Sequence, residues 1–437
     1  MIALLALLVL QQPQATTAIR AGTLIDGTGA APVRNAVILV QEGRITAVGA
    51  NVQIPNGATV IDLSAATVLP GFIDAHVHLA GHTIGDGDWQ HAGLTEMPSQ
   101  LALLGAAHAQ QTLEAGFTTV RVVGTGNFSD IALRNAINAG WIPGPRILGA
   151  GVSFGILGGH CDGTNGLQPW ALGGGREAGV ESGVADGVEA VRNAVRYAVK
   201  YGADVIKICA TGGVLSLTDS VGVQQYTEQE MRAIVETATQ LDRRVAAHAH
   251  GTAGLKAAVR AGVTSIEHGS ILDAEAAALM KQKGTWLVPT LLAGFTVESL
   301  ATAGRLPAPI AAKALAIAPR MRNSFKLAVD GGVKIALGTD AGVMRHGTNA
   351  REFALMVRYG MTPMQAIVAA TSGGATLLGL EREIGTIAVG KRADVVAVQG
   401  NPLDGIQVLQ SISFVMKDGR VFKRDGQVLG RSAAGVP

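Results

Sequence analysis

Hydrophobic and polar residues alternate in short stretches at both ends of the chain. Near the N-terminus these stretches are AIRAGTLIDG, NAVILVQEGRITAVG and TVIDL, and Gly, Asn and Asp separate them. This pattern is typical of β-hairpins. It returns near the C-terminus in GTIAVGKRADVVAVQG and FVMKDGRVFKRDG. We therefore predict one small β-sandwich domain assembled from both ends of the chain, residues 16–66 and 383–437.

The middle of the chain has a different pattern, in which short apolar runs alternate with amphipathic helical stretches. The apolar runs are VLPGFIDAHVHL, TTVRVVG, PRILGAG, DVIKICA, RVAAHAH, SIEHG, WLVPTLL and KIALGTD. The helical stretches are 98–115, 129–140, 183–201, 227–241, 252–261, 273–283, 308–330 and 349–378. Alternating strands and helices indicate a parallel sheet. Eight repeats favour a closed (β/α)₈ TIM barrel over residues 67–382, rather than an open doubly wound sheet.

A barrel of this kind carries its functional residues at the C-terminal ends of its strands. His76 and His78 end the first predicted strand, and residues two apart on a strand point to the same face. The polar residues at the ends of later strands are His248, His250, His268 and Asp340. Five of the ten histidines thus lie at strand ends. Imidazole and carboxylate ligands suit zinc, with manganese or iron as alternatives.

Lys207 is an exception within its strand, because it stands in the middle of the apolar run DVIKICA. Burying a bare ammonium group is costly, so this lysine must be paired or modified. A buried lysine paired with a carboxylate and a chemically modified lysine both remain open from these residues alone.

Composition excludes several classes of partner. The chain has 437 residues, of which 48% are hydrophobic and 16% charged, enough for a large buried core. The net charge is +2 and no basic stripe occurs, so we expect no nucleic-acid binding. No interior apolar run approaches the roughly 20 residues that a bilayer requires, so we expect no membrane span. A small-molecule partner is the remaining expectation.

The first residues, MIALLALLVLQQPQA, are typical of a secretory signal peptide over residues 1–15. We expect export to the periplasm or medium, with a cytoplasmic protein as the alternative because no Lys or Arg precedes the apolar run. Two cysteines, Cys161 and Cys209, do not make a disulfide scaffold. Each neighbours a candidate site residue, so the two could approach one another, but we expect ordinary small buried thiols.

Several motifs together resemble the amidohydrolase superfamily over essentially the whole mature chain. They are GTLIDGTG, VLPGFIDAHVHL, the strand lysine, HAHG, EHG, GTDAG and GTIAVGKRADVVAV. The resemblance implies two divalent metal ions, most consistent with zinc. It assigns His76, His78 and Asp340 to the more buried ion, and His248 and His268 to the more exposed one. It also implies that Lys207 is carboxylated and bridges both ions.

The resemblance implies a mechanism as well. Water held between two cations has a lowered pKa and attacks the carbonyl carbon as hydroxide. Asp340 would be both a ligand and the group that passes a proton to the leaving amine. His250 faces inward like His248, and only the resemblance selects His248 as the ligand. His250 would then support the site, contact substrate or be a core histidine.

Within the superfamily, the chain is similar to the branch of Xaa-Pro dipeptidases, metallo-carboxypeptidases and ochratoxin-degrading amidohydrolases. The segments that carry this likeness are GGHCDG, ATGGVLS and QQYTEQEM. It implies that His160 and Tyr226 contact the scissile carbonyl or the substrate carboxylate. The alternatives are a turn histidine and a tyrosine packed on the rim. Arg345 and His346, just past Asp340, are further candidates for substrate binding.

The expected reaction is hydrolysis of the amide bond to a C-terminal amino acid. Suitable substrates are a dipeptide such as Xaa-Pro, an N-acyl amino acid or an ochratoxin-like amide. A homo-oligomer is expected, since such assemblies are common in this family.

Three alternatives remain. The first is a cyclic amide hydrolase of the imidazolonepropionase type. The second is a serine hydrolase using Ser153, because GVSFG matches the G-x-S-x-G pattern. That elbow requires a helix directly after the serine, whereas a Gly-rich loop follows here. The third is a binding protein without catalysis, which the presence of Lys207 and Asp340 disfavours.

Overall fold

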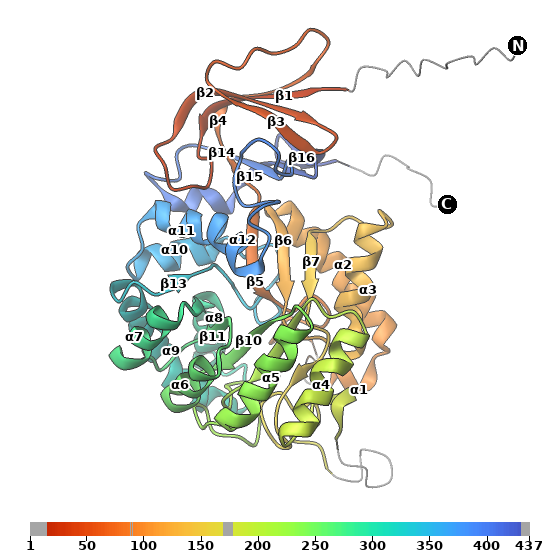
Figure 1. Cartoon of the computed structure of the whole chain (residues 1–437), viewed down its shortest axis with the longest axis vertical. Coiled ribbons are helices and arrows are strands. Elements are labelled where there is room, and N and C mark those ends of the chain that lie inside the picture. Colours follow the sequence, from red (N-terminus) through yellow and green to blue (C-terminus); the bar gives the residue numbers. More distant parts are fainter. Residues whose placement is uncertain (1–14, 88, 90, 169–177, 430–437) are drawn as a thin grey trace, which may run out of the picture.

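A computed structural model describes residues 15–87, 89, 91–168 and 178–429 (Figure 1). The predicted signal peptide, residues 1–15, lies outside the described residues except for Ala15. Among the helices of the described residues, none has the length and apolar character needed to cross a membrane.

Strands from both ends of the described chain form one hydrogen-bonded sheet at one end of the molecule (Figure 1). Its strands are β1 (Thr17–Leu24), β2 (Val33–Gln41), β3 (Arg44–Gly49), β4 (Thr59–Pro70), β14 (Val395–Gln399), β15 (Ile412–Lys417), β16 (Arg420–Arg424) and β17 (Gln427–Val428). The two ends of the chain meet where β14 pairs antiparallel with β4. Buried side chains of this sheet, including Ile19, Val68 and Phe414, form an apolar cluster separate from the main core. The alternating patterns therefore combine in one sheet.

The middle of the chain forms a parallel (β/α)₈ barrel, as the eightfold pattern predicts. Its strands are β5 (Phe72–Val77), β6 (Phe117–Val122), β7 (Arg146–Gly149), β9 (Val205–Cys209), β10 (Arg244–Ala249), β11 (Ser265–His268), β12 (Trp286–Val288) and β13 (Lys334–Ile335). A short extra strand, β8 (Ser153–Phe154), pairs with β9. The segment after β13 closes the barrel against β5, because the Ala75 N–H donates to the Leu337 carbonyl over 2.9 Å.

Helices surround the strands (Figure 1). They are α1 (Ala92–Thr95), α2 (Pro98–Glu114), α3 (Ser129–Asn138), α4 (Val188–Lys200), α5 (Glu228–Gln240), α6 (Thr252–Ala261), α7 (Ala274–Lys283), α8 (Leu291–Thr302), α9 (Ala308–Asp330), α10 (Arg351–Arg358), α11 (Pro363–Ala369) and α12 (Ser372–Leu378). Their apolar faces join the strands in one large core.

Two helical regions differ from the sequence pattern. The stretch 349–378 is three helices rather than one, because Gly360 adopts a φ of +131° and Thr362 begins α11 with a capping box to Gln365. The apolar run WLVPTLL contains the whole of β12 and the start of α8. Apolar residues alone do not distinguish a buried strand from a buried helix.

Candidate metal centre and active site

A cavity of about 760 Å³ is lined by residues at the C-terminal ends of the barrel strands. All six predicted metal ligands line it: His76, His78, Lys207, His248, His268 and Asp340. The C-terminal ends of parallel barrel strands share one face of the fold, so residues remote in sequence converge there. The structure thus brings the complete predicted ligand set to one place.

Asp340 lies between the two histidines of the first strand. Its Oδ1 atom is 3.4 Å from Nε2 of His76 and 3.3 Å from Nε2 of His78. The Asp340 N–H also donates to the His76 carbonyl over 2.7 Å, which anchors the segment after β13 beside β5. Burial opposes ionisation of Asp340, but the adjacent His76 and His78 hold its pKa well below the usual range. Asp340 is therefore a carboxylate that faces imidazole nitrogens.

His268 completes a three-residue group that could hold a metal ion. One potential ligand atom from each of His76, His268 and Asp340 lies within 4.8 Å of the other two. The ring of His268 is 4.9 Å from that of His76 and 4.6 Å from that of His248, measured between centroids. The rings of His76, His268 and His248 therefore lie next to one another in a single cluster.

Each of the four predicted histidine ligands has one ring nitrogen engaged by the protein. The contacts are His76 Nδ1 with Glu267 (2.8 Å), His78 Nδ1 with the Gly124 carbonyl (2.9 Å), His268 Nδ1 with Thr290 Oγ1 (2.7 Å) and His248 Nε2 with the Gly212 carbonyl (3.4 Å). Metal-binding histidines commonly donate from the nitrogen that does not bind the ion, which sets the tautomer. The other nitrogen of each ring remains available to a cation, so this set of donors fits a metal centre.

Two buried residues of this network were not identified from the sequence. Glu267 is fully buried beside His76, and Arg121 Nη2 lies 2.7 Å from its Oε1 atom. Burial opposes the charge of Glu267, but Arg121 and His76 lower its pKa to about 2. The EHG motif contains Glu267 directly before His268, which was the available signal. Arg121 is a charge inside the apolar run TTVRVVG, which was the available signal, but its partner is 146 residues away and could not be named from the sequence.

Lys207 lies in the floor of the cavity and is 4% exposed. Burial lowers its pKa to about 8, although Glu267 and Asp340 oppose that shift. The sequence predicts a lysine that must be paired or modified, and the opposite charges that act on Lys207 are Glu267 and Asp340 of the candidate metal centre.

Backbone conformations that L-residues rarely adopt occur at this site. The φ angles of His268, Thr290 and Asp340 are +71°, +50° and +60°. Such positions cost free energy and persist where surrounding contacts determine them, often at functional sites. Here the strained Thr290 holds the ring of the strained His268.

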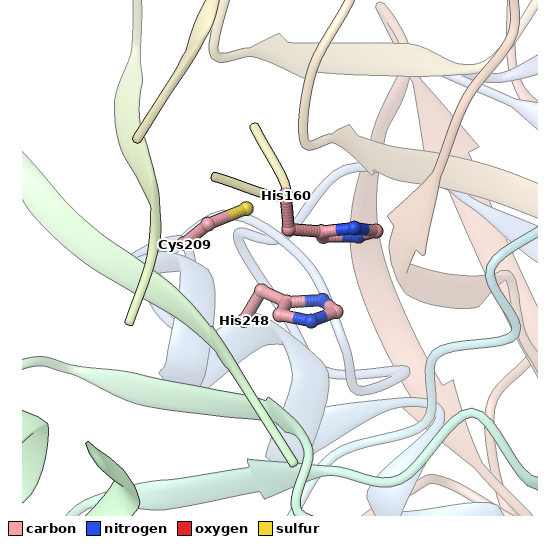
Figure 2. Close-up of side chains that lie close together, drawn as sticks. All are labelled: His160, Cys209 and His248. Atoms are coloured by element: carbon pink, nitrogen blue, oxygen red, sulfur yellow. The ribbon is translucent and has the colours of Figure 1, made fainter. Parts of the chain in front are cut away.

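His160 and His250 also line the cavity. Figure 2 shows the ring of His160 above that of His248. The centroids of the two rings are 4.3 Å apart. His250 is held through Nδ1 by Ser270 Oγ over 2.7 Å. Burial lowers the pKa of His160 to about 4 and that of His250 to about 3, so both rings are neutral near pH 7.

The cysteines are not the separate buried thiols that we expected. Cys161 and Cys209 form a disulfide, with 5.7 Å between their Cα atoms. Cys209 ends β9, and Cys161 follows His160 on the loop beyond β8. The residues are 48 apart in sequence, so the packing of that loop against β9 brings them together. Figure 2 shows Cys209 beside His160 and His248, but its bonded sulfur is not a thiolate ligand.

Three further candidates lie away from the cavity lining. Tyr226 is fully buried, and its hydroxyl donates to the Ala185 carbonyl over 3.0 Å. The expectation that Tyr226 contacts substrate therefore disagrees with the structure. It immediately precedes the N-cap of α5, which turns its side chain into the core. Tyr226 has a packing role, as the alternative of a packing tyrosine supposed, and its side chain is fully buried.

Arg345 and His346 do not reach the cavity either. Arg345 is exposed and pairs with Asp86 at 3.1 Å. His346 is buried, stacks on His108 with 4.3 Å between ring centroids, and contacts the His78 carbonyl through Nε2 at 3.2 Å. His346 therefore supports the backbone of the HxH motif instead of facing a substrate.

Ser153 lines the cavity but lacks the surroundings of an activated nucleophile. Its hydroxyl donates to the Val123 carbonyl over 3.0 Å. No described helix directly follows β8, because the 3₁₀ turn Val180–Ser182 and then α4 are the next helical elements along the described chain. The nucleophile elbow predicted as an alternative is therefore not formed.

The cavity has a polar floor and an apolar wall. The wall comes from α8 and α9, and includes Ala293, Val297, Ala314, Ile317 and Met321. Apolar lining with a few convergent polar groups is typical of a small-molecule site.

Comparison with known proteins assigns the family. The amidohydrolase family model matches residues 67–422. This chain belongs to the amidohydrolase family. It is 35% identical over 433 residues to ochratoxinase of Aspergillus niger, covering 94% of this chain and 87% of that protein. Among solved structures, a Xaa-Pro dipeptidase with methionine bound in its active site is 41% identical, with a TM-score of 0.89, and the match covers 94% of this chain and all of that one.

A more distant match is imidazolonepropionase of Mycolicibacterium smegmatis, 26% identical over 379 residues, covering 83% of this chain and 84% of that protein. The relatives support the branch that the sequence motifs indicated. Together with the family, they make this chain a hydrolytic enzyme that acts on amide bonds.

Proposed function

We propose that this amidohydrolase uses two divalent metal ions to cleave the amide bond to a C-terminal amino acid. The observation that carries the proposal is the convergence of six potential ligands on one cavity, with one nitrogen of each histidine held by the protein. The likeness to an ochratoxinase and to a Xaa-Pro dipeptidase supports the choice of bond.

We assign these residues to two ions as the family resemblance implied, although His268 also lies within reach of His76 and Asp340. His76, His78 and Asp340 would hold the more buried ion, and His248 and His268 the more exposed one. Lys207, buried among them, would bridge both as a carbamate, whose anionic oxygens replace an ammonium group that is costly to bury. Nitrogen and oxygen ligands suit zinc. When bound, such ions lower the pKa of water and polarise a carbonyl group.

The protein groups then have defined tasks in hydrolysis. Asp340 is ionised and faces the metal ligands, so it can take a proton from the attacking water and return it to the leaving nitrogen. Glu267 keeps the His76 Nδ1 proton in place and leaves Nε2 toward the cavity. The apolar wall of α8 and α9 excludes water from one side of the substrate.

The same apolar wall favours a substrate that carries an apolar group. A dipeptide such as Xaa-Pro, an N-acyl amino acid and an ochratoxin-like amide each combine an apolar group with a polar amide. Cyclic amides of the imidazolonepropionase type are the alternative, and the distant match to that enzyme is the observation that favours it.

Metal analysis combined with a substrate panel tests the proposal. Purified protein would be analysed for metal, and its hydrolysis of Xaa-Pro dipeptides, N-acyl-Phe compounds and imidazolonepropionate measured before and after chelation. We expect about two ions per chain, with cleavage of a linear amide that chelation abolishes and zinc restores. Cleavage of the cyclic amide alone would favour the alternative. Protein without metal, never exposed to chelator, would overturn the proposal.

Lys207→Ala tests the bridging carbamate. We expect activity to be lost and partly restored by short carboxylic acids, which can replace the carbamate oxygens. Lys207→Arg is the matched control, because it retains a cation and cannot be rescued in the same way. Loss without rescue, together with retained metal, would point to a site with one ion.

Export to an oxidising compartment is a separate proposal. The N-terminal residues and the Cys161–Cys209 disulfide both support it, because such bonds persist in the periplasm or outside the cell. Fractionation of producing cells, followed by mass spectrometry of the mature N-terminus, tests it. Intact protein confined to the cytoplasm would contradict it. We also propose a homo-oligomer, which light scattering of the purified protein would test.

A further inference from the structure

Lys313 of α9 places its ammonium group against the loop that joins β9 to α5. Nζ donates to three backbone carbonyls of this loop, those of Gly213 at 2.8 Å, Ser216 at 2.7 Å and Asp219 at 3.0 Å. It also lies 3.5 Å from Oδ1 of Asp219. An ammonium group has three N–H donors and no acceptor. The loop therefore offers one carbonyl to each donor of Lys313 and a carboxylate to its charge.

Hydrogen bonds within the loop hold these three carbonyls in place. Oδ2 of Asp219 accepts the Gly213 N–H at 3.1 Å, and Oδ1 accepts from the Ser216 hydroxyl. The contact with α9 is also largely shielded from water, because the side chains of Lys313 and Asp219 are 16% and 8% exposed. Removing the ammonium group would therefore leave polar groups of the loop without their donor where water has little access, which is costly.

Both sides of this contact line the cavity. The apolar residues that line it are Val214 and Leu215 of the loop and Ala314 and Ile317 of α9. Lys313 directly precedes Ala314 in the helix. Pro319, inside α9, has no N–H and so removes one backbone hydrogen bond of the helix. Contacts outside the helix, such as that of Lys313, therefore have a larger share in fixing the part of α9 before Pro319.

We propose that Lys313 is a positioning residue that fixes the distance between α9 and the loop, and thereby the width of the apolar part of the cavity. The contact then favours substrates with an apolar group large enough to touch both sides. Lys313 is not among the described residues that line the cavity, so it acts through the residues beside it. The effect on substrate selectivity rests on the proposed function, whereas the effect on the loop does not.

Hydrogen exchange of the full chain, measured by mass spectrometry, tests the effect on the loop. In Lys313→Ala we expect the backbone amides of residues 213–223 to exchange about tenfold faster than in wild type, because the loop loses the donor that holds it. Lys326→Ala removes an exposed lysine of the same helix and is the control. Exchange in Lys313→Ala as slow as in wild type would overturn the proposal.

Chemical rescue distinguishes a missing ammonium group from disturbed packing. Propylammonium has the three carbons and the ammonium group that Lys313→Ala lacks, so it should restore slow exchange. Tetramethylammonium carries the same charge without an N–H and should not restore it. Lys313→Met fills the space of the aliphatic stem, so it should exchange fast with or without propylammonium. Fast exchange in Lys313→Ala that propylammonium does not slow would contradict the proposal.

Kinetics with linear amides test the effect on selectivity. For Lys313→Ala we expect kcat/KM to fall about tenfold for N-benzoyl amino acids and less than about twofold for N-acetyl analogues. The loss should appear mainly in KM with an unchanged metal content, because Lys313 acts on the apolar wall rather than on the metal centre. Propylammonium should reverse the loss, and Lys326→Ala should show none.

Two kinetic results would contradict the role in selectivity. One is an equal loss for both classes of amide, and the other is a loss accompanied by reduced metal content, which would indicate a disturbed site. If the wild-type protein cleaves no amide at all, the proposed function fails, and hydrogen exchange still decides whether Lys313 holds the loop.

Discussion

Glu267 supports the candidate metal centre, because it contacts the predicted ligand His76 from within the barrel. It accepts from His76 Nδ1 on one oxygen and from Arg121 and Ser265 on the other. Arg121 also donates to the Ala75 carbonyl over 2.6 Å, so the ionic group joins β5, β6 and β11 inside the barrel. A carboxylate at this position orients a ligand and balances a buried cation.

Glu267→Gln should therefore impair both metal binding and stability. The variant loses the anion beside His76, and we expect metal affinity or activity to fall roughly 10- to 100-fold. It also leaves the Arg121 charge buried without its partner, which costs about 3–5 kcal/mol of unfolding free energy. Metal titration and denaturant unfolding measure the two effects. Glu228→Gln, at an exposed ion pair on α5, is the control. Unchanged metal affinity would contradict the orienting role.

At the scale of elements, the disulfide joins the loop that carries His160 to the strand that carries Lys207. The closed segment spans 48 residues. Loop-closure entropy for that length predicts that the cross-link adds about 4 kcal/mol to the unfolding free energy. The same bond holds His160 beside His248, so its loss should affect the site as well as the fold.

Denaturant unfolding with and without dithiothreitol measures this contribution. We expect reductant to lower the unfolding midpoint and the activity of the wild-type chain. The double variant Cys161→Ala and Cys209→Ala should start lower and show no response to reductant, which excludes an effect on other groups. A wild-type midpoint indifferent to reductant, with complete reduction shown by thiol counting, would contradict the prediction.

The helices α8 and α9 supply the apolar wall, and small residues in it set the space available. Ala314→Leu extends a side chain from α9 into the cavity. We expect kcat/KM to fall about tenfold for amides with a large aromatic group and to change little for N-acetyl analogues. Only the large aromatic group needs the space beside this wall. Leu315→Ala, at an exposed position of the same helix, is the control. Equal losses for both substrate classes would indicate disturbed packing.

For the whole molecule, Glu352 makes stability depend on pH. It is buried on α10 and accepts the N–H groups of Leu291 and Leu292 at the start of α8. Burial outweighs these hydrogen bonds and raises its pKa from 4.5 to about 8. Between these values the folded state binds more protons at this residue than the unfolded state, so its contribution to stability falls as pH rises.

Glu352→Gln removes this titration and should remove the corresponding slope. We expect the unfolding free energy of the variant, relative to wild type, to increase as pH rises from about 5 to about 8. Denaturant unfolding at several pH values measures the difference. A constant difference over that range would show that Glu352 is ionised throughout in the folded protein.

The sequence by itself determined the barrel architecture and the six candidate metal ligands that meet in the cavity. Eight alternations of apolar and amphipathic stretches specify the barrel, because each period is a local property of strand or helix. His76, His78 and Asp340 could be named because they stand at the C-terminal ends of strands, and these ends all lie on one face of the barrel. Lys207 was noticeable because a charge in an apolar strand requires compensation.

Only the tertiary structure decided which side chains meet across long separations and where loop residues point. Arg121 joins Glu267 and Cys161 joins Cys209 because separate elements pack together, and no local period encodes such pairs. Tyr226 enters the core instead of the cavity because of how the chain turns into α5. The hydrogen bonds that connect Asp219 through Ser216 to His160 likewise depend on how the loops pack together. In a strand, the periodicity of the backbone fixes the direction of each side chain. In a loop, only packing against the rest of the protein fixes that direction.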